Sequence, residues 1–188
     1  PSLVILDLMM PEVDGFDVLD WMRADDRTRQ VPVLVLSSRM LNLDDVKRLE
    51  RHALVTFQSK DVLSEEEIVS SLHQALFGTG TLPQHTSALV KRAVAYFHQN
   101  YDRALSRWEI AETIGVSESY LSRVFRQELG ISPWDYLNRY RILRAKRLLR
   151  RTSDSIKNIA PQVGFKDPAY FSRVFHRMTG ISPSAYRE

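Results

Sequence analysis

Residues 1–77 alternate between short apolar runs and longer amphipathic stretches. The apolar runs, which predict buried strands, are Leu3–Leu6, Val31–Leu36 and Ala53–Phe57. The stretches with apolar residues at helical spacing predict helices at Phe16–Ala24, Leu43–His52 and Ser64–Phe77. Strands without polar alternation are typical of a parallel sheet covered by helices, so the pattern predicts an α/β fold for this part of the chain.

The last of these helices carries its own start signal. Ser64 is placed to cap it, and Glu67 is placed to reach back to the cap. Residues 78–86 follow with two glycines, one proline and no periodicity, which is typical of a linker. The linker separates an α/β part at residues 1–77 from a second part at residues 87–188.

The second part has a helical pattern throughout and contains an internal repeat. Tyr120-Leu-Ser-Arg-Val-Phe125 matches Tyr170-Phe-Ser-Arg-Val-Phe175, and Gly130-Ile-Ser-Pro133 matches Gly180-Ile-Ser-Pro183, both 50 residues apart. In each copy a glycine ends one helix, a serine caps the next and a proline occupies its first turn. Two copies are too few for a solenoid, so a duplicated functional unit is the better interpretation.

Each copy has the pattern of a helix-turn-helix unit, at about 106–129 and 156–179. In the first, the small residue Ala111 lets two helices cross closely, Gly115 suits the positive φ of a tight turn, and Ser117 can cap the second helix. The turn of the second copy is one residue longer. The inward-facing positions are Ile110, Ala111, Ile114, Leu121, Val124 and Phe125 in the first copy and Ile159, Ala160, Val163, Phe171, Val174 and Phe175 in the second.

The charge changes sign across the linker. Residues 1–80 carry 8 basic and 14 acidic side chains, a net charge of −6, whereas residues 81–188 carry 18 and 9, a net charge of +9. A basic domain can attract a polyanion, although a solvated basic surface would explain the charge equally well. The absence of cysteine excludes disulfides and thiolate metal sites and fits a reducing cytoplasm. The apolar runs are too short to cross a bilayer, so we expect no membrane partner.

With these motifs in a basic segment, residues 87–188 resemble the DNA-binding domain of the AraC/XylS family. The resemblance implies an all-α domain of seven helices, two of which enter successive major-groove segments of double-stranded DNA on one face. Residues 134–151 would join the two units as one helix. It would span roughly 27 Å, near the ~34 Å between major-groove segments one turn apart.

The resemblance also indicates which side chains meet DNA. It places base contacts of the first helix at Ser119, Ser122 and Arg123, with Arg126 projecting on the same side. The matching positions of the second helix are Pro168, Ala169, Ser172 and Arg173, and the first two lack hydrogen-bonding side chains, so we expect this helix to be the weaker reader. Candidates for phosphate contacts, which position without specifying sequence, are Ser117, Arg139, Lys166, His176 and Arg177.

Simpler roles are open for several of these side chains. Arg123 or Arg173 could pair with a carboxylate such as Glu118 or Glu128 instead of DNA. Aromatic residues of such helices belong more often to a core than to a stacking surface, and we expect this of Tyr120, Phe125, Tyr170 and Phe175.

Pro161 sits in the first helix of the second unit, where an interior proline costs about 3 kcal/mol. If that helix begins near Asn158, Pro161 falls in the first turn and is harmless. If the helix begins at Ser155, a kink is expected. The second unit can therefore differ in geometry from the first.

The first part of the chain resembles a response-regulator receiver. Asp7 ends a strand and is followed by Pro11 and by Asp14-Gly15, as in the phosphoacceptor loop of that family. Ser37 resembles the hydroxyl residue that ends the fourth strand, and Lys60 the lysine after the fifth, with Phe57 at the aromatic switch position. The resemblance implies phosphoryl transfer from a histidine kinase to Asp7, with Lys60 and a Mg²⁺ ion neutralising the developing charge.

The match to a receiver is incomplete. Only six residues precede Asp7, so the chain begins at the family's third strand, and the acidic pair that helps Asp7 hold Mg²⁺ is absent; Asp61 also replaces a usual proline. We therefore expect a partial flavodoxin-like fold with strands three to five, no cofactor in this fragment, and little acetyl-phosphate labelling of Asp7. The Leu3–Leu6 edge would invite pairing with a second copy as a homodimer.

Three functions compete at this stage. The first is a sequence-specific transcription regulator of a two-component phosphorelay, in a plain response regulator or in the tail of a hybrid sensor kinase. The second is an aspartate-nucleophile phosphatase, but Met9 stands where such an enzyme has a second aspartate. The third is a helical protein-interaction module that never touches DNA. We favour the regulator, which is not an enzyme.

Overall fold

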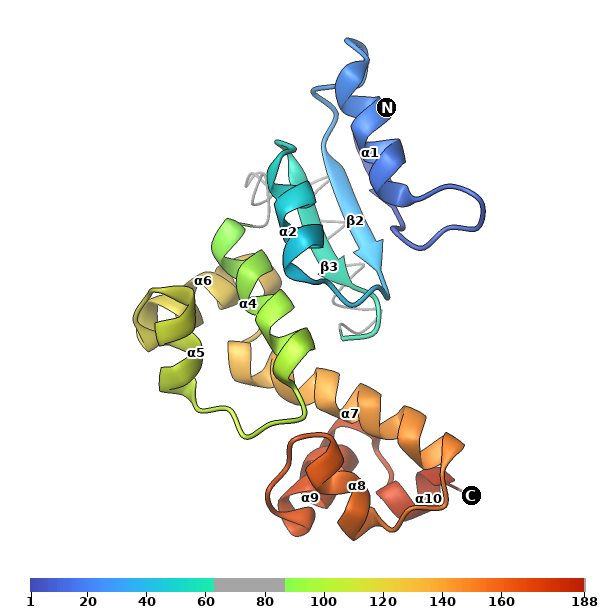
Figure 1. The fold of residues 1–188 in the computed structure, drawn as a ribbon, viewed down its shortest axis with the longest axis vertical. Coiled ribbons are helices and arrows are strands. Elements are labelled where there is room, and N and C mark those ends of the chain that lie inside the picture. Colours follow the sequence, from blue (N-terminus) through green and yellow to red (C-terminus); the bar gives the residue numbers. More distant parts are fainter. Residues whose placement is uncertain (63–86, 188) are drawn as a thin grey trace. The chain divides into compact units, whose positions relative to one another are not determined.

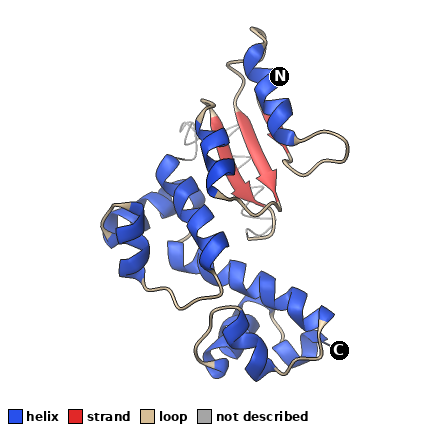
Figure 2. Ribbon diagram, in the orientation of Figure 1, coloured by secondary structure: helices blue, strands red, loops and turns tan. Residues whose placement is uncertain are grey.

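The structure is a computed structural model that describes residues 1–62 and 87–187 (Figure 1). The expected helix Ser64–Phe77, its capping box and the linker at 78–86 lie outside the described residues. The described residues form an α/β part followed by helices (Figure 2), and none of these helices is long and apolar enough to cross a membrane. The chain divides into two compact regions, one built around the α/β part and one around the helical half.

The α/β part contains a parallel sheet in the order β1 (Val4–Leu6), β2 (Val33–Ser37) and β3 (Val55–Ser59). All residues of β2 and β3 are buried, which fits their lack of polar alternation. The strand β2 begins two residues later than predicted because Pro32, which has no N–H, cannot take part fully in the ladder. Among the described residues only β2 pairs with β1, whose Ile5 is 53% exposed.

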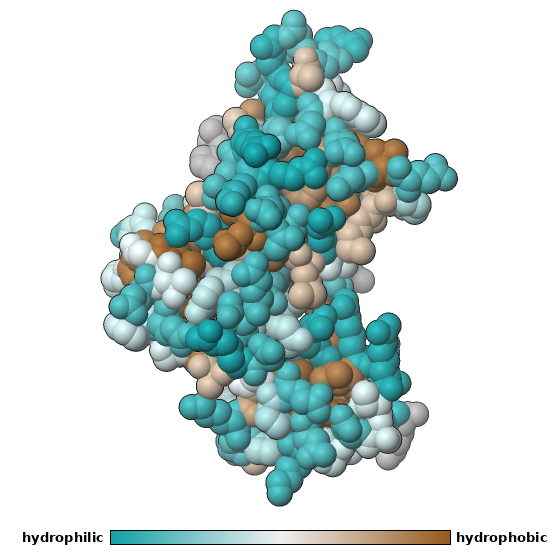
Figure 3. Space-filling view, in the orientation of Figure 1, coloured by the Kyte–Doolittle hydropathy of each residue, from teal (hydrophilic) through white to brown (hydrophobic). Residues whose placement is uncertain are grey.

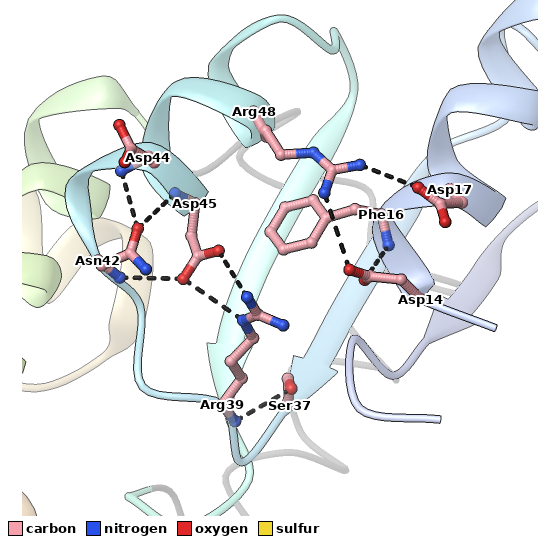
Figure 4. A network of polar contacts seen from close by, with 9 residues as sticks. All are labelled: Asp14, Phe16, Asp17, Ser37, Arg39, Asn42, Asp44, Asp45 and Arg48. Carbon is pink, nitrogen blue, oxygen red and sulfur yellow. Dashed lines mark hydrogen bonds and ion pairs between the residues drawn. The ribbon is translucent and has the colours of Figure 1, made fainter. Parts of the chain in front are cut away.

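Two helices cover this sheet, α1 (Gly15–Ala24) and α2 (Leu43–Glu50). The Asp14 side chain caps α1 by accepting the N–H of Phe16, and Asn42 caps α2 through a complete capping box. The helices are joined by Arg48 of α2, whose guanidinium lies 4.4 Å from the Phe16 ring centre and forms an ion pair with Asp17 at 3.1 Å (Figure 4). This network holds α2 against the first turn of α1.

Residues 87–187 contain seven helices, the number that the family resemblance implies. They are α4 (Ala88–Asn100), α5 (Arg107–Ile114), α6 (Glu118–Leu129), α7 (Pro133–Arg151), α8 (Ile156–Gln162), α9 (Pro168–Thr179) and α10 (Pro183–Arg187). The repeated Gly-Ile-Ser-Pro motif acts as predicted. In its first copy Ser132 caps α7 and Pro133 occupies the first position; in the second, Gly180 ends α9 with φ +79°.

The long helix α7 packs into two aromatic cores. Near its N-terminus, Tyr136 lies 6.0 Å from both Phe97 and Phe125, measured between ring centres. In its C-terminal half, α7 contributes to a core with α8 and α9. That core contains Ile142, Ala145, Leu149, Ile159, Ala160, Val163, Phe165, Phe171, Val174 and Phe175. The predicted inward-facing residues of both repeats are buried, except that Val124 is only half-buried.

The two helix-turn-helix units differ in their turns. Three residues join α5 to α6, and Gly115 adopts φ +83° there, as the tight turn requires. Five residues join α8 to α9, two more than in the first unit, whereas the sequence predicted one more. Pro161 falls in the last turn of α8, not in its first, because the helix begins at Ile156 with Ser155 as its cap. The helix ends one residue after Pro161, so the missing N–H removes a single interior hydrogen bond.

His98 is predicted to make stability fall in acid. Burial lowers its pKa to about 3, and its ring lies 4.3 Å from the Tyr140 ring and 3.1 Å from the Tyr136 hydroxyl. A depressed pKa means that the unfolded state binds the proton more tightly. The contribution of neutral His98 to the free energy of unfolding is therefore fully present above about pH 6.5. Below that pH it declines by up to about 1.4 kcal/mol per pH unit.

The measurement is urea unfolding at pH 7 and pH 5, followed by the amide signals of α7. We expect the loss of unfolding free energy between these two pH values to shrink in a His98→Gln variant. An equal loss in both proteins would show that His98 is not the group responsible.

Candidate functional sites

The carboxyl ends of the three strands bring the predicted receiver residues together. Asp7 follows β1, Ser37 ends β2 and Lys60 follows β3, and such ends meet at one edge of a parallel sheet. The Lys60 ammonium lies 2.6 Å from the Asp7 carboxylate, whose other oxygen accepts the Met9 N–H at 3.0 Å. Phe57 is fully buried in β3, three residues before Lys60. The predicted set is thus assembled around one half-exposed carboxylate.

The local environment favours the ionised form of Asp7. Burial raises the pKa of this carboxyl group, but hydrogen bonds from Lys60, from the Met9 N–H and from Ser37 outweigh burial and leave the pKa lowered. Asp7 is therefore an anion at neutral pH, which is the form required of a nucleophile.

The loop after β2 fixes the position of Ser37. The Ser37 hydroxyl accepts the N–H of Arg39 at 3.1 Å, and the Arg39 side chain forms an ion pair with buried Asp45 at 3.1 Å (Figure 4). Asp45 also accepts the Asn42 N–H as part of the α2 capping box. One carboxylate thus ties the loop to the first turn of α2.

A magnesium ion does not fit the residues described around Asp7. Mg²⁺ needs octahedral oxygen coordination, and one of the two Asp7 oxygens is already bonded to Lys60. Within residues 1–62 and 87–187 there is no cluster of three carboxylate or histidine side chains that could hold a metal. We therefore assign no step to a metal ion.

The outer face of α6 carries the side chains predicted for the first unit. Ser119, Arg123 and Arg126 are exposed, and Ser122 is half-buried. In the part of the chain that the structure describes, Arg123 has no ion pair, and its guanidinium lies 5.1 Å from the centre of the Tyr120 ring. Glu128, an alternative partner in the sequence, instead accepts the Ser87 N–H at 2.8 Å.

The equivalent face of α9 repeats this arrangement. Arg173 is exposed, forms no ion pair with any described residue, and lies 5.9 Å from the Tyr170 ring centre. Ser172 differs from its counterpart because its hydroxyl donates to the Pro168 carbonyl at 3.0 Å. The other predicted positions on or near α9 are half-buried Pro168 and exposed Ala169, Lys166, His176 and Arg177.

The expectation that all four repeat aromatics lie in the core is wrong for the tyrosines. Phe125 and Phe175 are completely buried, whereas Tyr120 and Tyr170 are 43% and 40% exposed. Each tyrosine directly precedes a buried residue, Leu121 or Phe171. Each also lies three positions before an arginine on the same side of its helix. The Tyr–Arg pairs are therefore part of the surface, at equivalent places in both units.

The two remaining phosphate candidates have different surroundings. Ser117 caps α6 by accepting the Tyr120 N–H at 3.2 Å, and its hydroxyl lies 3.3 Å from that of Ser119. Arg139 is half-buried on α7.

A groove of about 340 Å³ beside α6 includes residues that the sequence did not single out. It contains three of the predicted side chains, Ser119, Ser122 and Arg126. The other lining residues are Arg107, Ile110, Glu118, Leu121, Ser132, Pro133 and Trp134. Trp134 directly follows the repeated Gly-Ile-Ser-Pro motif. This position next to a duplicated motif is the sequence feature that could have marked Trp134 as a surface residue of the site. Hydrophilic residues cover most of the face drawn in Figure 3, where apolar residues emerge in small groups.

Two family models match this chain. Residues 1–73 match the response regulator receiver domain, and residues 110–188 match a helix-turn-helix domain.

Whole-length similarity links the two parts to one kind of protein. An uncharacterized response regulatory protein of Staphylococcus epidermidis is 30% identical over all of this chain, which covers 80% of that protein. The uncharacterized HTH-type transcriptional regulator YisR of Bacillus subtilis is 34% identical over 65% of the chain. The chain spans only 42% of the length of YisR.

Solved structures match the helical half. The C-terminal domain of AraT, a response regulator from Geobacillus stearothermophilus, is 39% identical with a TM-score of 0.53, covering 54% of this chain and 85% of that one. The DNA-binding domain of the transcriptional factor AdpA, solved with a target DNA, is 30% identical with a TM-score of 0.50, covering 53% and 88%.

Replacing Lys60 by methionine is expected to raise the pKa of Asp7. The substitution removes the shortest hydrogen bond to the carboxylate and the nearby positive charge, while burial, which raises the pKa, remains. The measurement is a titration of the Asp7 carboxyl carbon by NMR. Lys47→Met is the control, because Lys47 pairs with Asp44 on α2. An unchanged Asp7 pKa in Lys60→Met would contradict the observed ion pair.

Proposed function

Because this chain belongs to the response regulators that join a receiver domain to an AraC-type helix-turn-helix DNA-binding domain, we propose that it binds a bipartite DNA site. In this proposal α6 and α9 each enter one of two successive major-groove segments. The observation that carries the proposal is the pair of exposed arginines, Arg123 and Arg173, at equivalent positions of the two units.

The chemistry of these positions suits base recognition. An exposed guanidinium without a carboxylate partner retains its donors for guanine O6 and N7. The neighbouring tyrosine ring restricts the side chain of each arginine, which lowers the entropy lost when it binds. Arg123 and Arg173 therefore combine the absence of an ion pair with any described residue with the partial ordering that favours a base contact.

The connector has a length that suits two groove segments. Helix α7 contains 19 residues and spans about 28 Å, while successive major-groove segments lie about 34 Å apart. The difference between these two lengths is small enough for the residues that flank α7 at its two ends to cover.

We further propose unequal roles for the two reading helices. Ser122 and Ser119 belong to the groove beside α6, where Arg107 and Arg126 supply positive charge for phosphate groups. On α9 the Ser172 hydroxyl is engaged by the Pro168 carbonyl, and Ala169 offers only a methyl group. The first helix would then discriminate bases more strongly than the second.

For a complete receiver, with the strands and the acidic pair that the family resemblance adds to the part described here, we propose that Asp7 accepts a phosphoryl group from a histidine kinase. The carboxylate oxygen would attack the phosphorus of a phosphohistidine, the P–N bond would break, and its electron pair would return to the imidazole. Lys60 would offset the charge that develops on the phosphoryl oxygens, and the Ser37 hydroxyl would donate a hydrogen bond to the product. Phe57, buried in β3 three residues before Lys60, occupies the position that the receiver resemblance assigns to the aromatic switch.

Substituting Arg123 by alanine is expected to relax base preference at one position of the site. Loss of a bidentate contact should cost about 1–3 kcal/mol against the preferred base, while other positions keep their preference. Arg139→Ala should weaken binding to all sequences alike, because a phosphate contact carries no sequence information. The measurement is fluorescence anisotropy with a duplex selected from random DNA and with its single-base variants.

The matched control is Arg27→Ala, an exposed arginine of the α/β part that should leave DNA affinity unchanged. Affinity of the unmodified protein should fall steeply with added salt, since phosphate contacts release counterions. A protein that retards no duplex at low salt would support the protein-interaction alternative.

A further inference from the structure

An arginine charge is buried in the middle of α7. Arg141 is only 3% exposed, and burial lowers its pKa to about 10. Its Nε donates to the Tyr101 carbonyl and its Nη2 to the Arg103 carbonyl, each at 2.8 Å. Both carbonyls belong to the loop between α4 and α5. The planar fork of a guanidinium is suited to two parallel bonds of this kind, which compensate part of the cost of burial.

The second helix-turn-helix unit approaches the same guanidinium from its turn. Phe165 lies with its ring centre 5.5 Å from the Arg141 guanidinium carbon. Gly164, the residue before it, adopts φ +84°. A Cβ atom on Gly164 would lie 2.1 Å from the Tyr101 carbonyl oxygen and 2.8 Å from Arg141 Nε. The turn of the second unit therefore rests directly against the loop that joins α4 to α5 and leads into the first unit.

Tyr101 extends this contact into the second core. Its side chain packs against the core that α7 forms with α8 and α9, and its ring meets the Tyr140 ring edge-on at 5.3 Å. Its hydroxyl accepts a hydrogen bond from Arg144 Nε at 3.2 Å. A residue of the loop that leads into the first unit is thus held by α7 and by the second core together.

We infer that Arg141 and Gly164 are positioning residues that set the relative orientation of the two helix-turn-helix units, and with it the spacing between the two half-sites that the protein accepts. The inference rests on the proposed bipartite DNA binding. It adds that spacing is determined at this junction, and not by the length of α7 alone.

The geometry makes spacing sensitive to small changes at the junction. A rotation of about 10° at one end of a helix about 28 Å long moves the other end by about 5 Å. That displacement exceeds the rise of one base pair, about 3.4 Å. A packed junction is therefore required if two reading helices are to stay in register with one DNA face.

The first test compares bipartite and isolated half-sites. In R141K a point charge on a flexible stem replaces the fork, so the carbonyls lose their paired donor while the charge remains. We expect affinity for the bipartite duplex to fall about 10-fold or more, because linkage of the two contacts is weakened. Affinity for the α6 half-site alone should change less than about 2-fold. Inserting or deleting one base pair between the half-sites lowers the affinity of the unmodified protein, and in R141K this loss should shrink by a factor similar to the fall in bipartite affinity.

Two further variants sharpen the result. G164A adds a methyl group against the Tyr101 carbonyl without removing any charge, and should reproduce the loss of spacing preference. R150K changes an exposed arginine of the same helix and should match the unmodified protein. Amide spectra at Phe125 and Phe175 verify that both cores remain folded in each variant.

A measurement without DNA separates this inference from the proposed function. Residual dipolar couplings report the relative orientation of α6 and α9, and one alignment tensor should fit both helices in the unmodified protein but not in R141K. The inference is overturned if R141K and G164A keep the orientation and the spacing preference. If the unmodified protein binds no bipartite duplex, the proposed function fails, while the couplings still decide the role of the junction.

Discussion

The architecture of the helical half depends on α7, which contributes buried side chains to one core near its N-terminus and to another in its C-terminal half. Tyr136 belongs to one aromatic core, and Leu149, more than three turns later, belongs to another. Because a helix is stiff over this distance, α7 fixes the separation of the two cores along its axis. The polar segment between them must also be buried, and there Arg141 requires acceptors. The loop at Tyr101 supplies them, so its position follows from the need to satisfy one buried charge.

The duplicated units show how one motif adapts to two environments. Gly115 and Gly164 occupy equivalent places and have nearly the same positive φ. A side-chain atom at Gly115 would meet no atom within 4 Å, so only the backbone conformation demands glycine there. At Gly164 the Tyr101 carbonyl oxygen and the Arg141 side chain also leave no space. The longer second turn, with Pro161 ending α8 early, belongs to the copy that has to fit against α7 and Tyr101 together.

Periodicity and capping signals predicted most of the architecture, because these depend on local sequence. The strands, the repeat and the inward positions such as Phe125 follow from spacing alone. The same reasoning assigned Tyr120 to the core, since spacing does not show that a tyrosine can lie over an arginine at the surface. It also passed over Arg141, because a polar residue in a basic helix has the pattern of a solvated one. Residues brought together from distant segments, as at Gly164, require coordinates.

The environment of each arginine decides how much of the basic charge can act on DNA. Arg141 is counted in the net charge of +9, yet its donors are consumed by carbonyl groups and its charge is enclosed. Arg123 and Arg173 remain exposed and without carboxylate partners among the described residues. Exchanging either of them is expected to leave the cores intact, whereas exchanging Arg141 removes two hydrogen bonds inside the scaffold. Net charge is compatible with a polyanionic ligand, and burial separates the exposed arginines whose donors are available to it from Arg141, whose donors are bound to carbonyl groups.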